Sequence, residues 1–300
     1  MHLRFVSSLI VSGLLTVPLV GREVVYTDPP QSAPAPQQAA TGLAAAPDQW
    51  LGTDGVTLRY REAGTGVPVV LIHGYSTNLE TMIPLAAALA PPHRTIAMDV
   101  RGFGQSSKFA DASRFGRAMV DDVVRLMDHL KVDRAHLVGH SMGALIAAQV
   151  AARYPDRVRS ATVIAAPFYP DKATFTQESS RWVTELENGR GLTRFIQWLF
   201  PGMDEKTAAG FNTQILTANE LPSLIAVMRS LPELALRGVD GEAPLLVTVG
   251  TRDPLQPQSV AFAKASKGAR LLTVPDADHM SIASSPELHQ AMRTLIADGR

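Results

Sequence analysis

The sequence contains no cysteine. A disulfide-linked scaffold, a thiolate metal site and a cysteine nucleophile are therefore excluded, although the absence does not indicate a compartment. The sequence also has no excess of positive or negative charge, since 28 basic residues balance 28 acidic residues. Without a basic stripe, the chain offers no footprint for a nucleic-acid partner and no polybasic membrane patch.

The chain is long enough, at 300 residues, to bury a sizeable core in one large α/β domain or two small ones. Its content of 46% apolar and 19% charged residues is typical of a globular protein. The glycine-containing stretches 64–68 and 102–107 lack the spacing and the lysine of phosphate-binding loops. No pattern indicates a metal site or a required cofactor.

The N-terminal residues have the pattern of an export signal. Arg4 precedes an apolar run from Phe5 to Val20, which contains Pro18 and is short for a membrane span. Residues 1–21 therefore predict export to the periplasm or the medium, or membrane anchoring if the segment is not cleaved. Residues 22–48 are rich in Pro, Ala and Gln and predict a tether, so the folded domain is expected over 49–300.

Strand and helix patterns alternate along this domain. Short apolar or alternating runs predict strands at 56–63, 67–74, 94–102, 134–141, 158–167, 244–250 and 269–275. Helices are predicted at 79–90, about 120–130, 142–154 and about 286–297. Such alternation predicts a mostly parallel, doubly wound sheet with helices on both faces.

The segment 168–237 interrupts the alternation. Its pattern is helical, and it contains two of the three tryptophans and five of the ten phenylalanines. We interpret it as a helical cap inserted over the ends of the strands. Its aromatic side chains favour either an apolar acyl or alcohol pocket or an ordinary core for the cap itself.

A serine lies between two glycines where a buried strand meets an apolar helix, in "LVGHSMGALIAAQ" (137–149). A sharp strand-to-helix turn strains its central residue and excludes side chains two positions away on either side. Ser141 would then project at the carboxyl edge of the sheet, beside the free N–H groups of a helix N-terminus. We predict that Ser141 is a nucleophile.

A serine nucleophile needs a base, and His279 follows the last predicted strand in "PDADHMSIASS". His140 is adjacent to Ser141, but consecutive side chains diverge on such a turn, so His140 is not expected to be the base. The order of nucleophile, acid and histidine along the chain also favours His279.

The acid is expected after another strand. Asp253 lies in a turn directly after the strand at 244–250, where it can hold the His279 imidazole in one tautomer. Asp171, which follows the strand at 158–167, is a rival. Asp276 and Asp278 are too near His279 along the chain to face its ring easily.

Two backbone donors are expected to form an oxyanion hole. One is the N–H of Met142, directly after the nucleophile, and the other is the N–H of Tyr75 in the loop after the strand at 67–74. Gly74 allows the backbone to approach closely in that loop.

From about Trp50 to its end, the chain resembles the α/β-hydrolase fold enzymes, in particular a capped serine esterase. The resemblance lies in five motifs in the family's order: "HGYS" (73–76), "DVRGFGQSS" (99–107), "GHSMG" (139–143), "GTRDP" (250–254) and "DADHM" (276–280). It implies a sheet of about eight strands and hydrolysis of carboxylic esters of small or medium apolar substrates through an acyl-enzyme. The single His-Gly pair argues against a true lipase.

The same triad serves other reactions in this family, and they remain open. Lactone hydrolysis, carbon–carbon bond hydrolysis and cofactor-free perhydrolysis are alternatives that fold and triad do not separate. A non-catalytic binding protein is a further alternative. Epoxide hydrolases and haloalkane dehalogenases use an aspartate nucleophile, so Ser141 argues against both. The sequence does not indicate an oligomeric state.

Overall fold

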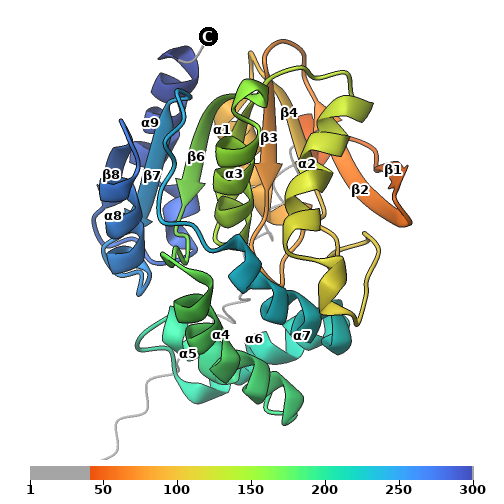
Figure 1. Ribbon diagram of the computed structural model, residues 1–300, viewed down its shortest axis with the longest axis vertical. Coiled ribbons are helices and arrows are strands. Elements are labelled where there is room, and N and C mark those ends of the chain that lie inside the picture. Colours follow the sequence, from red (N-terminus) through yellow and green to blue (C-terminus); the bar gives the residue numbers. More distant parts are fainter. Residues whose placement is uncertain (1–40, 299–300) are drawn as a thin grey trace, which may run out of the picture. The chain divides into compact units, whose positions relative to one another are not determined.

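The computed structural model describes residues 41–298, in which eight strands form one sheet (Figure 1). The order across the sheet is β1-β2-β4-β3-β5-β6-β7-β8. The strands are β1 (Gln49–Thr53), β2 (Val56–Ala63), β3 (Pro68–Ile72), β4 (Arg94–Met98), β5 (Ala135–His140), β6 (Val158–Ile164), β7 (Leu245–Gly250) and β8 (Arg270–Val274). β2 pairs antiparallel with β1 and β4, and all other pairs are parallel. The mostly parallel sheet is confirmed.

Five helices cover the two faces of the sheet: α1 (Ile83–Leu89), α2 (Arg117–His129), α3 (Met142–Arg153), α8 (Gln256–Ala265) and α9 (Pro286–Asp298). Successive residues of a buried strand point to opposite faces, so β3 places Val70 and Ile72 in one apolar cluster and Val69 and Leu71 in the other. The first cluster includes residues of α2, α3 and α8, and the second includes residues of α1 and α9. This is the doubly wound arrangement that the alternation predicts.

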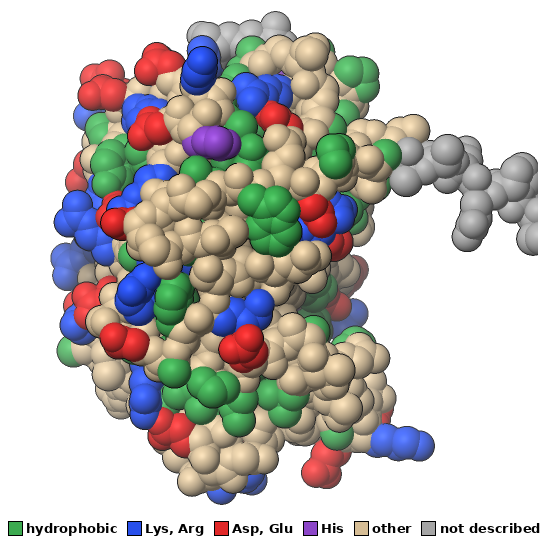
Figure 2. Space-filling model, turned by 90° about the vertical axis from the view of Figure 1, so that its right-hand side faces the viewer, with side chains coloured by type: hydrophobic (Ala, Val, Ile, Leu, Met, Phe, Trp, Pro, Cys, Tyr) green, Lys and Arg blue, Asp and Glu red, His purple; other side chains and the backbone are tan. Residues whose placement is uncertain are grey.

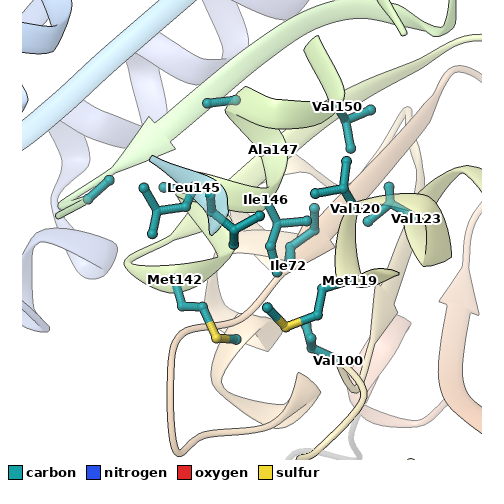
Figure 3. Close-up of a cluster of buried hydrophobic side chains, with 14 of the residues drawn as sticks. Ile72, Val100, Met119, Val120, Val123, Met142, Leu145, Ile146, Ala147 and Val150 are labelled. Atoms are coloured by element: carbon teal, nitrogen blue, oxygen red, sulfur yellow. The ribbon is translucent and has the colours of Figure 1, made fainter. Parts of the chain in front are cut away.

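The core beneath the nucleophile turn is closely packed (Figure 3). Leu145 and Ile146 of α3 are completely buried and lie among side chains from α2 and β3, including Val120 and Ile72. Burying a side chain of this size contributes about 1.5–3 kcal/mol. The packing therefore fixes the start of α3, where Ser141 and Met142 lie.

The loop 99–107 is held by buried charges. Arg101 makes two 2.6 Å hydrogen bonds to the carboxylate of Asp122 on α2, in a buried, two-point ion pair. Asp99 is completely buried and accepts hydrogen bonds from the N–H of Leu79 and from Arg59. These contacts shape the carboxyl edge of β4, next to β3.

The cap consists of α4 (Lys172–Glu187), α5 (Thr193–Leu199), α6 (Glu205–Ala218) and α7 (Leu221–Ser230), inserted between β6 and β7. Figure 1 shows these helices together at one end of the sheet, the end to which the arrowheads of the parallel strands point. The helical insertion expected over 168–237 is confirmed.

Two details differ from the expectation. β1 and α8 are additional elements that the sequence patterns did not predict. Residues 41–48, which we assigned to the tether, contact the domain: Leu43 is buried with the α1 and α9 side chains, and Asp48 forms ion pairs with Arg59 and Arg61. An apolar contact at Leu43 and ion pairs at Asp48 thus connect this stretch to the domain.

The expected export signal at 1–21 and most of the tether lie outside the described residues. Within 41–298, no helix is long and apolar enough to cross a membrane. On the face shown in Figure 2, basic and acidic side chains are interspersed, consistent with the zero formal net charge of the chain.

Candidate active site

Ser141 occupies a strained turn between β5 and α3. Its backbone has φ 54° and ψ −117°, outside the regions that residues with a side chain favour. A Cβ on Gly139 would lie 2.1 Å from the carbonyl oxygen of Gly143, and one on Gly143 would lie 2.0 Å from that of Ile72. Main-chain atoms thus exclude a side chain at both positions, as the sequence pattern indicates.

His279 and Asp253 come together in a buried pair. The Nδ1–H of His279 donates to Oδ2 of Asp253 at 2.9 Å, and each residue is 3% exposed. The other carboxylate oxygen, Oδ1, accepts from the N–H of Leu255 at 2.9 Å. Because one oxygen is held by the main chain, the other is fixed toward the imidazole, and Nε2 remains available to act as a base.

The rival acids have other partners. Asp171 caps the N-terminus of α4, where it is exposed and accepts from the N–H of Thr174 at 2.8 Å. Asp278 accepts from the N–H groups of Met280 and Ser281 in the turn around the histidine. Neither contact reaches the imidazole of His279.

His140 lies against His279 but not as a base. Its Nε2–H donates to the main-chain carbonyl of His279 at 2.8 Å, and the two ring centroids are 5.0 Å apart. Burial lowers the pKa of His140 to about 4, with the neighbouring His279 adding to the effect, so His140 is neutral at pH 7. His279 is therefore held at two points, its side chain by Asp253 and its main chain by the residue before Ser141.

The oxyanion loop, which we define as residues 73–77, is fixed around the Gly74 carbonyl. That oxygen accepts from Nδ1–H of His73 at 2.7 Å and from the hydroxyl of Thr77 at 3.0 Å. Nε2 of His73 accepts from the N–H of Val100, and burial lowers the pKa of His73, so the neutral tautomer fits both bonds. Because a trans peptide is flat, fixing this carbonyl turns the N–H of Tyr75 to the opposite side.

The loop lies directly against the nucleophile turn. A Cβ on Gly74 would be 3.2 Å from Cβ of Ser141. Met142 is the first residue of α3, and the first N–H groups of a helix lack intrahelical partners. The structure thus brings the turn of Ser141 and Met142 beside the loop of Tyr75, as the sequence analysis expects of an oxyanion hole.

A Gly143→Ala protein is expected to lose about 10²-fold or more in kcat/KM, because the added methyl group meets the carbonyl oxygens of Ile72 and His73 and displaces the turn from the oxyanion loop. Gly210→Ala is the matched control, since Gly210 lies in α6 with nothing within 4 Å of the added carbon. That change is expected to stabilise the protein by about 0.5–1 kcal/mol. Steady-state kinetics and thermal unfolding measure the two effects, and an unimpaired Gly143→Ala protein would contradict the steric argument.

An apolar cavity of about 50 Å³ lies between Ser141 and the cap. The body contributes Tyr75 and Met142 to its lining. The cap contributes mainly aromatic side chains: Tyr169, Phe175, Trp182, Phe195 and Trp198. Of the two roles that the sequence left open for the cap aromatics, these five line a pocket, while Trp182, Phe195 and Trp198 also pack on one another.

Sequence reasoning did not find the roles of His140 and Thr77 at the site, nor that of Asn219, whose side-chain amide donates to the carbonyl of Ser76 in the oxyanion loop. Their partners lie on segments far away along the chain or, for Thr77, on the oxyanion loop itself, where only geometry reveals the bond. A histidine directly before the nucleophile was a signal, but the sequence argument used it only to reject His140 as a base.

Comparison with known proteins places the chain in a family. A family profile described as the alpha/beta hydrolase fold matches residues 67–286. The chain belongs to this family.

Curated relatives and solved structures agree with the family. The chain is 30% identical over 285 residues to the dihydrolipoyllysine-residue acetyltransferase component of the acetoin cleaving system of Pseudomonas putida, covering 86% of this chain and 68% of that protein. It is 28% identical to 2-(acetamidomethylene)succinate hydrolase of Mesorhizobium japonicum, covering 78% of this chain and 88% of that protein. A thermophilic esterase from Thermogutta terrifontis has the same fold, with a TM-score of 0.64 and 24% identity over 85% of this chain and 99% of that one. The protein is a hydrolase of this fold.

Proposed function

We propose that the protein is a serine hydrolase that cleaves carboxylic esters with small apolar acyl groups through an acyl-enzyme. The observation that supports this most is the buried His279–Asp253 pair beside the strained turn of Ser141, beneath an apolar cavity. The pair, the turn and the cavity each have a role in the same reaction, the hydrolysis of an ester through an acyl-enzyme.

In this reaction Ser141 attacks the ester carbonyl while Nε2 of His279 takes the hydroxyl proton. The N–H groups of Tyr75 and Met142 stabilise the oxyanion, and Asp253 stabilises the imidazolium. His279 returns the proton to the leaving alcohol, which leaves an acyl group on Ser141. A water molecule then attacks this acyl-enzyme as His279 takes its proton, and His279 returns that proton to Ser141 Oγ as the acid leaves.

The size of the cavity favours a short acyl group. A volume of about 50 Å³ has room for roughly three to five water-sized groups. Its lining is mostly apolar and favours an apolar acyl chain, although Glu178, Ser179 and the polar ends of Tyr169, Trp182 and Trp198 also belong to it. We therefore expect acetyl to butyryl groups to fit this space best.

The test is hydrolysis of p-nitrophenyl esters from acetate to octanoate by the full chain, together with labelling by a fluorophosphonate and mapping of the labelled peptide. We expect the highest kcat/KM for acetate to butyrate and labelling at Ser141. Labelling at Ser141 without hydrolysis of any ester would instead favour lactone, carbon–carbon or peroxide chemistry at the same serine. An unlabelled, folded protein would overturn the nucleophile and favour a binding protein.

Trp198→Ala is expected to extend the accepted chain length, because removal of the indole enlarges the cap side of the cavity. The ratio of kcat/KM for octanoate to that for acetate should rise about tenfold or more, within the range of a few buried methylene groups. Trp50→Ala is the matched control, since Trp50 lies on β1, is 46% exposed and does not line the cavity. An equal ratio in the two variants would show that Trp198 does not limit the acyl chain.

A further inference from the structure

Two hydrogen bonds join the cap to the oxyanion loop. The phenolic hydroxyl of Tyr75 donates to the carbonyl of Leu224 in α7 at 2.8 Å. The side-chain amide of Asn219, directly after α6, donates to the carbonyl of Ser76 at 3.1 Å. The two bonds therefore reach consecutive residues of the loop from the junction of two cap helices.

The Tyr75 side chain is fixed at its ring as well as at its hydroxyl. It is 8% exposed and makes edge-to-face contacts with Phe103 of the body and Phe195 of the cap. Burial raises the pKa of Tyr75 well above its usual value, so the hydroxyl keeps its proton and remains a donor. The side chain thus bridges the body and the cap, while the N–H of the same residue is a proposed oxyanion donor.

Ser76 adds a second restraint to the same loop. Its φ of 62° lies in the left-handed region, which a residue with a side chain adopts only when its surroundings hold it there. The amide of Asn219 holds the carbonyl of Ser76 from the cap side, and Thr77 holds the carbonyl of Gly74 from within the loop. The peptide that carries the Tyr75 N–H is therefore flanked by restraints on both sides.

We infer that the Tyr75 hydroxyl and the Asn219 amide are positioning groups, through which the docked cap orients the Tyr75 N–H toward the oxyanion. This inference rests on the proposed serine hydrolase chemistry. The cavity is lined by cap and body together, so we expect a substrate too large for it to displace the cap. Displacement of the cap breaks both bonds and leaves the oxyanion hole with one oriented donor. An ill-fitting substrate is therefore expected to have a lower kcat as well as a higher KM.

The variants that test this inference are Tyr75→Phe, Asn219→Ala and the double variant. Each single change keeps the backbone N–H of Tyr75 and removes one bond to the cap. We expect kcat for p-nitrophenyl acetate to fall about fivefold or more in each, and about 10²-fold in the double variant, which approaches the loss of one oxyanion donor. KM is expected to change less than twofold.

Ser223→Ala provides a matched control in the same helix. The Ser223 hydroxyl donates from α7 to the carbonyl of Gly102 at 3.2 Å, so it links the cap to the body without touching the oxyanion loop. This variant is expected to keep kcat within twofold while its Tm falls by an amount similar to that of Tyr75→Phe.

A second readout separates positioning from general stability. An alkylboronic acid forms a tetrahedral adduct with the serine and places an oxygen in the oxyanion hole, whereas butyrate binds as a ground-state product. The Ki for butylboronic acid should rise in parallel with the loss of kcat, while the Ki for butyrate stays unchanged. Equal kinetics in Tyr75→Phe, Asn219→Ala and Ser223→Ala, or an unchanged boronic acid Ki, would overturn the inference.

The rate constant for fluorophosphonate labelling of Ser141 tests the positioning inference independently of whether the substrate is an ester. A wild-type protein that labels but cleaves no ester overturns the proposed substrate, and slower labelling of Tyr75→Phe and Asn219→Ala than of Ser223→Ala still supports the inference. Equal labelling rates in these variants overturn it. A wild-type protein that does not label overturns both.

Discussion

Ser141→Ala is expected to lower kcat for p-nitrophenyl butyrate about 10⁴- to 10⁶-fold, because the variant has no atom that can form the acyl-enzyme. The oxyanion donors and the cavity remain, so a small residual rate above that of water is expected. Stopped assays with concentrated protein measure the residual rate, and labelling by the fluorophosphonate should disappear.

The fold is expected to survive this change. The Ser141 side chain makes no helix-capping hydrogen bond, and alanine differs from serine only by the hydroxyl oxygen. Ser180→Ala on the exposed side of α4 is the matched control and should retain full activity. A Ser141→Ala protein that keeps more than about a tenth of the activity would contradict the proposed nucleophile.

Asp253→Asn is expected to lower kcat about 10⁴-fold with little change in KM. The asparagine amide has the same shape but carries donors, and an amide donor facing Nδ1 of His279 favours the tautomer with the proton on Nε2. That nitrogen can then no longer accept the proton from Ser141. Steady-state kinetics with p-nitrophenyl butyrate measure the loss.

Asp171→Asn is the control that separates the two candidate acids. Asparagine caps a helix as well as aspartate does, so α4 should keep its N-terminus and activity should stay within twofold. If Asp171→Asn lost the activity and Asp253→Asn kept it, the proposed triad would contain the wrong acid.

The patterns that predicted correctly are local ones. Buried parallel strands read as apolar runs, so β3, β5 and β7 were found within one or two residues of their ends. The turn of Ser141 was predictable because the atoms that exclude a side chain at the two glycines lie only four or five residues away or at the end of the adjacent strand. The positions of Asp253 and His279 could be anticipated as well, because parallel strands of one sheet place the loops that follow them at the same edge.

The elements that were missed lack a local pattern. β1 is a five-residue edge strand with one buried side chain, Leu51, and α8 contains Pro257 and polar residues that obscure a helical stripe. The bond from Tyr75 to Leu224 joins residues 149 positions apart, and that from His140 to His279 spans 139 positions. Such contacts depend on how the cap and the loops sit in space, which periodicity does not encode.

The crowding at Gly139 and Gly143 has a consequence for how this sequence can evolve. The atoms that exclude a side chain at both positions belong to main-chain carbonyl groups, which every amino acid carries. No second substitution elsewhere can therefore relieve the clash, so neither glycine has a compensatory partner. At Gly102 the nearest atoms belong instead to the side chains of Phe115 and Val227, which smaller residues could relieve, but the φ of 90° at Gly102 strains any residue with a side chain. The nucleophile turn is thus inaccessible to suppressor mutations that act by making space.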